Sequence, residues 1–251
     1  MDRSEYYNQS IKRAIQIMHL FNSQEKELSL AEISRKMDIH KSIVYRILIT
    51  LESEGWLVKN PETNKYMLGI KLLLLSSVVL DDLVVRKTAL PIMKKLSAET
   101  GETVVLTMYS DGGAICIEKI ESDNSIKITS QVGKFFPLHA GATGLAVLMG
   151  MPDEIRKEIL KRKPLEKFTE KTETDPDKII KLVEEAKKDD YIISVGSVDP
   201  GVVAIGIPIN FTQGNIFMGL SITGPEYRFD EQKISFVVDE LKKAKKEILL
   251  G

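Results

Sequence analysis

The chain is poor in the residues that build covalent and metal-bound frameworks. Its 251 residues include one cysteine, Cys116, and three histidines, His19, His40 and His139. A single cysteine excludes an intrachain disulfide framework and a multi-cysteine zinc site, and the histidines have no metal-ligand spacing. Cys116 stands among isoleucines in AICIEKI, which favours a buried structural thiol over a nucleophile. We therefore expect no metal and no cofactor.

The chain also lacks a charge excess and a long apolar run. It carries 35 Lys and Arg against 36 Asp and Glu, a formal net charge of −1. This balance excludes a protein that holds nucleic acid by bulk charge alone, so any DNA-binding groups have to be arranged locally. The most apolar stretch, 72–85, is interrupted by Asp81 and Asp82 and falls short of the roughly 20 residues that span a bilayer. Because the start, MDRSEYYNQS, has no apolar core of a signal peptide, we expect a soluble, cytoplasmic protein.

A helix-turn-helix is predicted within the first 55 residues. Ser29 and Glu32 form a capping box, in which the serine hydroxyl accepts from the third helical N–H and Glu32 reaches back to Ser29. This short helix stops near Asp38, and a second one follows almost at once and ends at Gly55. Two short helices joined by a tight turn are typical of a helix-turn-helix. The apolar residues expected to form its core, together with those of a preceding helix, are Ile11, Ile15, Met18, Phe21, Leu30, Ile33, Met37, Val44, Ile47, Leu48 and Leu51.

A β-hairpin and a linker helix are predicted next. Two short strand-like runs, WLVKN and KYMLG, flank the polar cluster 60–64 directly behind the second helix. The order of elements predicts a winged helix-turn-helix over residues 1–70. From Gly69 to about Ala98 the sequence is again helical, and Pro91 is expected to break it into two pieces. We assign residues 71–90 to a linker helix.

Residues 91–251 mix strands and helices. A hairpin that turns at 111–112 is predicted over 103–121, followed by a third strand over 126–132. The remaining predicted elements are helices at 142–149, 153–162 and 177–189, strands at 191–195, 202–209 and 216–223 with a turn at 213–215, and a closing helix over 230–250. That last helix places on one face Phe236, Val237, Leu241, Ala244 and Ile248. An antiparallel sheet flanked by helices makes this an α+β domain.

The second helix of the helix-turn-helix has the composition that DNA recognition requires. No carboxylate stands between Asp38 and Glu52. The donors suited to phosphates or base edges are His40, Lys41, Ser42, Tyr45 and Arg46, with Lys59 and Lys65 on the hairpin. Residues 1–68 hold ten Lys and Arg against nine Asp and Glu, so a dimer with two recognition helices about 34 Å apart would have to supply specificity. The alternatives are a small helical domain with a solvated basic face and a protein-docking winged helix.

The run from 29 to 60, followed by KYMLG and a long helix, resembles the N-terminal domain of IclR-type transcriptional regulators. The second half agrees in order and spacing through TGETV at 100–104, VGKFFPLHAGATG at 132–144, VVAIGIPI at 202–209 and LSITGP at 220–225. The resemblance covers about residues 10–249. It implies a winged helix-turn-helix, a linker helix used in dimerisation, and a GAF-like domain that binds a small effector.

By this resemblance the effector pocket is lined by Ile128, Phe136, Ala142, Thr143, Ser194, Pro208, Ser221 and Thr223. The chain departs from the family at Leu145, where a lysine is usual, and at 194–197, where Ser-Val-Gly-Ser replaces an acidic run and leaves Asp199 as the nearest carboxylate. Free N–H groups at the predicted N-terminus of the helix at 142–149 attract a carboxylate. Two hydroxyls on one face of the strand at 216–223 lie opposite, unless that face is solvated. These features suit a small organic effector such as a carboxylate or an aromatic acid.

These observations predict a ligand-responsive transcriptional regulator. It would bind a palindromic operator of double-stranded DNA as a homodimer or tetramer and change affinity when an effector binds. The alternatives are a small-molecule-binding enzyme with a winged-helix docking module and a protein-interaction adaptor. The expected pocket offers only hydroxyls and one remote Asp, so we do not expect an enzyme. The segment 141–144 lacks the ending of a phosphate loop, which disfavours nucleotide binding, and His139 has either a ligand-contacting or a packing role.

Overall fold

A computed structural model describes residues 7–22, 24–210 and 216–250. The chain divides into two compact units, residues 1–82 and residues 83–251. None of the helices in the described part of the chain combines the length and the apolar character needed to cross a membrane. The turn predicted at 213–215 lies outside the described residues.

The first unit is a helix-turn-helix with a small hairpin. Its elements are α1 (Gln9–Met18), α2 (Leu30–Met37), α3 (Lys41–Ser53), β1 (Leu57–Lys59), β2 (Tyr66–Leu68) and α4 (Leu72–Asp82). The predicted capping box is confirmed, since Ser29 N donates to Glu32 Oε2 at 2.8 Å and Glu32 N donates to Ser29 Oγ at 3.2 Å. Gly55, with φ of +73°, follows the end of α3 as predicted. β1 and β2 pair antiparallel and form the predicted hairpin.

The core of the first unit corrects the prediction for α1. Its buried members are Ile17, Phe21, Leu28, Ile33, Val44, Leu48, Leu57 and Tyr66. Ile11 and Ile15, which were expected inside, are 59% and 46% exposed. Helix α1 carries apolar residues on two sides, and helical spacing alone does not say which side packs against α2 and α3.

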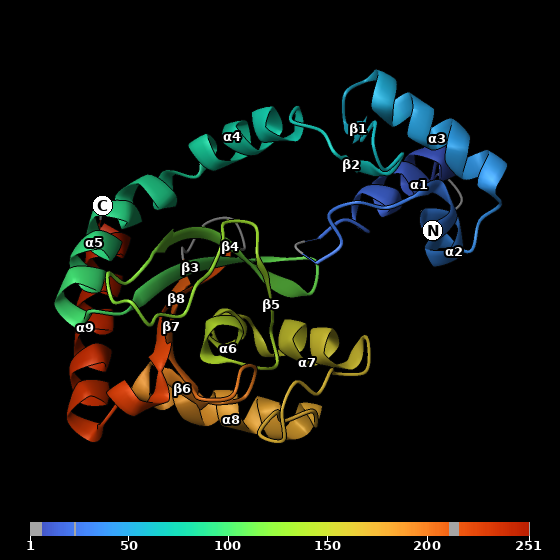
Figure 1. The fold of residues 1–251 in the computed structure, drawn as a ribbon. Helices are drawn as coiled ribbons and strands as arrows, with labels where there is room; N and C mark the ends of the chain where they lie inside the picture. The colour runs from blue at the N-terminus through green and yellow to red at the C-terminus, as the bar shows by residue number, and fades with distance from the viewer. Residues whose placement is uncertain (1–6, 23, 211–215, 251) are drawn as a thin grey trace. The chain divides into compact units, whose positions relative to one another are not determined.

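The second unit contains a six-stranded antiparallel sheet in the order β5-β4-β3-β8-β7-β6. Its strands are β3 (Thr103–Ser110), β4 (Gly113–Ile120), β5 (Phe135–Pro137), β6 (Ile192–Val195), β7 (Val202–Asn210) and β8 (Phe217–Pro225). Its helices are α5 (Val84–Thr100), α6 (Ala142–Met149), α7 (Asp153–Lys161), α8 (Pro176–Asp189) and α9 (Glu231–Leu250). Helices α5 and α9 cover one face of the sheet, and α6, α7 and α8 lie on the other (Figure 1).

Strand alternation divides β7 and β8 between two layers. On β7, Val203, Ile205 and Ile207 belong to the core that faces α5 and α9, whereas Ala204 belongs to the core around α6. Glycines on β7 and β8 let α6 approach closely, because a Cβ on Gly206 would lie 2.5 Å from the carbonyl oxygen of Ala142. The side chains at alternate positions of β8 therefore point toward α6, where the site described below is built.

Three predictions for this part of the chain are wrong. Pro91 does not break the helix, which is interrupted at Leu83 instead, because Pro91 lies on the exposed side of α5 while Ala89 and Met93 anchor the other side in the core. Residues 126–132 form no strand, and β5 pairs with β4 in their place. Phe236 is 42% exposed, although Val237, Leu241, Ala244 and Ile248 on the same helix are buried as predicted.

Candidate functional site

Helix α3 presents an exposed polar face at the surface of the first unit. His40 caps the helix, with its Nδ1 accepting from Ser42 N at 3.3 Å and lying 2.8 Å from Ser42 Oγ. Lys41, Tyr45 and Arg46 are exposed, and neither basic side chain forms an ion pair with another described residue. The side chains predicted to contact DNA from this helix therefore point to solvent while Val44 and Leu48 are buried beneath them.

The two predicted hairpin lysines have different surroundings. Lys59 is exposed, with its Nζ 5.8 Å from the centre of the Tyr66 ring. Lys65 is half-buried, and its Nζ lies 3.6 Å from Glu32 Oε2, so part of its charge is balanced within the unit.

The turn between β1 and β2 is hydrogen-bonded to Glu27, a residue that lies outside the hairpin. Glu27 accepts a hydrogen bond from Asn60 Nδ2 at 2.8 Å and another from Thr63 Oγ1 at 3.0 Å. These bonds to the ionised carboxylate lower the pKa of Glu27 from its ordinary value of 4.5. The same carboxylate thus fixes the turn between β1 and β2 to the segment before α2.

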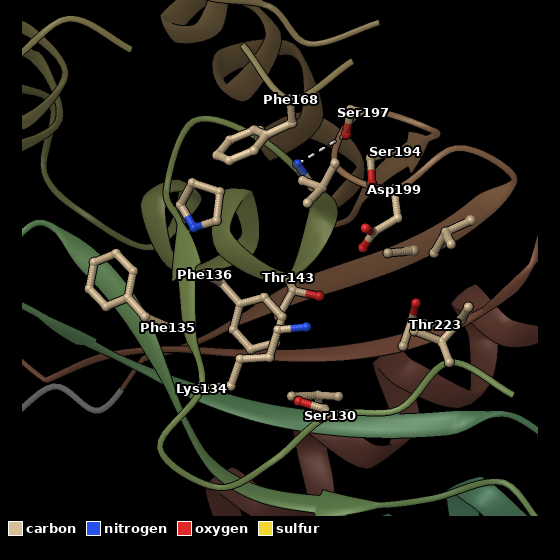
Figure 2. A pocket seen from close by; sticks show the side chains of 18 of the residues that line it. Ser130, Lys134, Phe135, Phe136, Thr143, Phe168, Ser194, Ser197, Asp199 and Thr223 are labelled. Atoms are coloured by element: carbon tan, nitrogen blue, oxygen red, sulfur yellow. Dashed lines mark hydrogen bonds between the residues drawn. The ribbon is translucent and has the colours of Figure 1, made fainter. Parts of the chain in front are cut away.

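The second unit encloses a cavity of about 180 Å³ between the sheet, the N-terminus of α6 and two loops (Figure 2). Five of the residues predicted for the effector pocket line it, namely Ile128, Phe136, Thr143, Ser194 and Thr223. The other residues around it include Val105, Ser130, Lys134, Phe135, Phe168, Ser197, Asp199, Val202 and Ala204. The cavity thus has an apolar wall and a limited set of polar groups, as small-molecule sites usually do.

The remaining three predicted pocket residues lie outside this lining. Ala142 is buried at the first position of α6, and its backbone N–H donates to Ser194 Oγ beside the cavity. Ser221 is 1% exposed and lies behind Thr143, with 3.1 Å between the two hydroxyl oxygens. Pro208 pairs with Gly219 in the sheet. A Cβ added to Gly219 would lie 3.1 Å from the Cβ of Ala146, so this part of the sheet, Pro208 included, lies beneath the middle of α6.

The N-terminus of α6 is capped by one side chain from β6 and another from the loop that follows β6. Ala142 N donates to Ser194 Oγ at 2.7 Å, and Gly141 N donates to Ser197 Oγ at 3.1 Å. Figure 2 shows the second of these bonds at the edge of the cavity. The stretch 194–197 therefore satisfies backbone donors that would otherwise be free at the start of the helix.

The two β8 hydroxyls face the interior of the unit. Thr223 is 6% exposed and donates to Val203 O at 3.2 Å, while Ser221 donates to Val105 O at 3.5 Å. The alternative in which this face of the strand is solvated is therefore wrong.

Two charged residues of the cavity, Lys134 and Asp199, were not among the predicted pocket residues. Lys134 stands just before β5, and Asp199 stands in the loop between β6 and β7. Lys134 lies inside the run 132–144 that carries the family resemblance, which was the one sequence signal available for it. No periodic pattern marks either residue, because both belong to loops.

The other polar candidates do not form a reactive or metal-binding centre. Cys116 is fully buried as predicted, and burial raises the pKa of its thiol. His139 stacks on Phe168 with 5.7 Å between the ring centres, and its Nε2 lies 2.8 Å from Glu166 O, which is a packing arrangement. Within residues 7–22, 24–210 and 216–250, no group of three or more His, Cys, Asp and Glu side chains is placed to hold a metal ion.

Comparison with protein families identifies the family to which the two units belong. Residues 77–249 match the family described as bacterial transcriptional regulator IclR C-terminal, and residues 10–61 match the IclR helix-turn-helix domain. This chain belongs to the IclR family of transcriptional regulators. The predictions of an IclR-type, DNA-binding regulator and of an α+β fold with a GAF-like second domain are confirmed, and the family favours the regulator over the enzyme alternative.

Individual IclR-family members resemble this chain over nearly its whole length. The HTH-type transcriptional regulator KipR of Bacillus subtilis is 30% identical over 241 residues, which cover 96% of both chains. An IclR regulator structure from Alicyclobacillus acidocaldarius matches with a TM-score of 0.85 and 25% identity, over 98% of this chain and 99% of that one. A structure of an IclR homologue from Microbacterium hydrocarbonoxydans, complexed with 4-hydroxybenzoate, matches in fold with a TM-score of 0.78 and 23% identity, over 96% of this chain and 98% of that one.

One departure from the family pattern lies on α6, the helix that borders the cavity, and the other contacts the start of that helix. Leu145 is 3% exposed and packs in the apolar core around α6, where a leucine side chain is well accommodated. The serines at 194 and 197 cap the same helix. This IclR-family chain therefore keeps the cavity but surrounds the start of α6 with hydroxyls.

Proposed function

We propose that this chain is a dimeric, ligand-responsive regulator that binds a palindromic operator and changes its DNA affinity when a small organic molecule occupies the cavity. Residues 1–70 would bind DNA, 71–90 would act as linker and dimerisation helix, and 91–251 would bind the effector. As a regulator of transcription it would act in the cytoplasm. The observation that carries this proposal is the exposed outer face of α3, which has no carboxylate from Lys41 to Leu51.

The DNA-binding part of the proposal rests on donors that are free to meet a phosphate or a base edge. Lys41 and Arg46 are exposed and unpaired among the described residues, and Ser42 and Tyr45 are exposed beside them. Arginine suits a bidentate contact to a guanine, and lysine suits a phosphate. Lys59 and Lys65 would meet the backbone from the hairpin, with His40 at the start of the helix.

Dimerisation is supported by the apolar surface of α4. Five of its aliphatic side chains are between 51% and 65% exposed, namely Leu73, Leu74, Leu75, Val78 and Val79. Apolar patches of this kind are rarely left in contact with water and usually mark an interface. A second copy of α4 would cover them and would bring two α3 helices to one palindrome. The same surface is compatible with a tetramer built from two such dimers.

The effector is proposed to be a small organic molecule held in the cavity of the second unit. The cavity combines the Phe136 ring and aliphatic side chains with hydroxyls and two charged groups. The Microbacterium hydrocarbonoxydans homologue is complexed with 4-hydroxybenzoate, a compound of that class. A ligand that binds one arrangement of the linker helices more tightly than another would shift the spacing of the two α3 helices and hence the operator affinity.

Titration of fluorescent operator DNA with the full chain tests the DNA-binding face. An operator is first selected from genomic fragments. Arg46→Ala is expected to raise the Kd by about tenfold to a hundredfold, because one bidentate base contact is worth about 1–3 kcal/mol. Arg162→Ala is the matched control, since this arginine lies on the surface of the second unit in an i,i+4 pair with Glu158.

The salt dependence of the same titration separates the alternatives. A regulator loses affinity steeply as salt rises and keeps its preference for the operator over random DNA. If Arg46→Ala left both the operator affinity and the thermal unfolding unchanged, Arg46 would not belong to the DNA-binding face of α3. The absence of any DNA preference at every salt concentration would favour a protein-interaction adaptor.

Sedimentation of the full chain tests the dimer. Val78→Asp places a charge on the apolar surface of α4 and is expected to yield monomers at concentrations where the unmodified chain is a dimer or a tetramer. Asp177→Asn on the exposed side of α8 is the control. An unchanged assembly state in Val78→Asp would exclude this surface as the interface.

A further inference from the structure

The hydrogen-bonding groups around the cavity differ in whether their protons are free. Thr223 Oγ1 donates its proton to Val203 O at 3.2 Å. Ser221 Oγ lies 3.5 Å from Val105 O and 3.1 Å from Thr143 Oγ1, and either hydroxyl of the Ser221–Thr143 pair can be the donor. A hydroxyl has one proton and two lone pairs. Thr223 therefore presents only acceptor lone pairs to the cavity, and the Thr143 oxygen also has a lone pair that can accept from a ligand.

Asp199 adds a third acceptor on the same side of the cavity. Its carboxylate points into the space that the hydroxyls of Thr143 and Thr223 also face (Figure 2). It forms no ion pair with another described side chain. A carboxylate and two acceptor hydroxyls match the three N–H donors of a primary ammonium group.

Two backbone donors at the start of α6 are already used, and Thr143 N follows them in the helix. The backbone N–H groups of Gly141 and Ala142 already donate to Ser197 and Ser194. The cation that faces the cavity is Lys134, whose Nζ enters it beside the Phe136 ring, 5.1 Å from the ring centre (Figure 2). The anionic end of a ligand is therefore attracted to Lys134.

Lys134 and Asp199 enter the cavity from different loops and do not pair with each other. Their charges lie more than 4.0 Å apart, since no ion pair joins them. A plain carboxylic acid would satisfy Lys134 and leave the Asp199 charge facing an anion. A molecule with both charges satisfies the two residues at once, and its carbon skeleton packs on Phe136, Val105 and Ala204.

We infer that the effector is a small zwitterionic amino acid. Its ammonium group binds the oxygens of Thr143, Thr223 and Asp199, and its carboxylate faces Lys134. This inference rests on the proposed role of the cavity as the effector site. It narrows the expected ligand from small organic acids in general to those that carry a primary amine.

Calorimetric titration of the full chain tests the inference with matched pairs of compounds. The standard amino acids are compared with acids of the same skeleton without the amine, such as alanine with propionate and phenylalanine with 3-phenylpropionate, and with 4-hydroxybenzoate. At least one amino acid is expected to bind about a hundredfold more tightly than its deaminated partner, because a site built for a polar group discriminates against an analogue that lacks it.

Variants at the two charges locate the binding. Asp199→Asn is expected to raise the Kd of that amino acid by about tenfold to a hundredfold and to leave the deaminated acid unchanged or better bound, since it removes one partner of a charge pair. Lys134→Met is expected to weaken both compounds. Asp239→Asn, an exposed carboxylate on α9, is the control and is expected to change neither.

The outcomes separate this inference from the proposed function. Deaminated acids that bind as tightly as amino acids and shift operator affinity would overturn the inference and leave the regulator intact. Failure of every amino acid to bind would also overturn it. An amino acid that binds through Asp199 while the operator Kd stays unchanged would support the inference and contradict the proposed ligand response.

Discussion

Two helices of this protein begin with serine caps, and they obtain those caps in different ways. In the first unit, α2 is capped by Ser29, which immediately precedes it and is paired with Glu32 three residues on. In the second unit, α6 is capped by Ser194 and Ser197, which lie 52 and 56 residues away from the amides they accept from. The first cap exists as soon as the helix forms. The second exists only once the sheet has brought β6 and the loop after it to the start of α6.

This difference matches what the two units present to their ligands. The first unit keeps its polar side chains on an exposed helix face, where a macromolecule can meet them. The second unit gathers polar groups from distant segments around a cavity of about 180 Å³, where only a small molecule fits. Long-range contacts should therefore contribute more to the stability of the second unit, and local ones to that of the first.

The largest effect is expected from a long-range ion pair of the second unit. Glu102 is 2% exposed, and Arg228 approaches it with 2.7 Å between Nε and Oε1. Arg228→Met leaves the buried carboxylate unpaired and should reduce the free energy of unfolding by about 3–5 kcal/mol in urea denaturation. Arg162→Met breaks an exposed pair, which solvent screens, and should change the free energy of unfolding very little. Equal losses of unfolding free energy in the two variants would contradict the expectation that long-range contacts contribute more to the stability of the second unit.

Loss of the long-range cap should have the next largest effect. Ser194→Ala removes the acceptor of a buried helix amide and is expected to destabilise the second unit by about 1–2 kcal/mol. Hydrogen exchange at the Ala142 amide should accelerate in the same variant. Ser235→Ala, on the exposed side of α9, is the control. An unchanged exchange rate at Ala142 would show that the serine does not protect this amide.

Loss of the local cap should cost somewhat less and should be easier to restore. Ser29→Ala is expected to destabilise the first unit by about 1 kcal/mol and to speed exchange at the Glu32 amide. Ser29→Asp supplies another acceptor at the same position and should recover most of the loss. If both substitutions were equally destabilising, the capping hydrogen bond would not be the cause.

The smallest effect concerns the pH dependence of the first unit. The bonds from Asn60 and Thr63 lower the pKa of Glu27, so its contribution to stability is present above the ordinary value of 4.5 and is lost as the pH falls through the lower, folded-state pKa. The difference in stability between the unmodified chain and Glu27→Gln should therefore shrink as the pH falls below 4.5 and through the lower folded-state pKa. A difference that is constant over this range would mean that the ionised carboxylate does not hold the hairpin turn.

Local patterns predicted most of the first unit because its contacts are close in the sequence. The capping box, the tight turn and the hairpin each involve neighbouring residues. The errors arose where packing partners decide the outcome. Ile11 and Ile15 share a stripe on α1 that the unit does not use, and Pro91 is tolerated because the opposite side of α5 is anchored in the core.

The residues that line the cavity were predicted only in part, again because packing decides which segments come together. The residues found on the family's motifs, such as Thr143 and Thr223, do line it. Lys134 and Asp199 come from loops, which have no periodicity, and the segment 126–132 alternates like a strand but borders the cavity as a loop. Pattern and period cannot tell which loops a folded sheet brings together.

The sequence by itself determined the winged helix-turn-helix, its acid-free helix face and the α+β character of the second unit, because each depends on spacing within a few residues. The tertiary structure alone decided which hydroxyls cap α6 and that Lys134 and Asp199 face one cavity. The two capping serines lie 52 and 56 positions from the amides that donate to them, and only the packing of the antiparallel sheet brings such distant residues together.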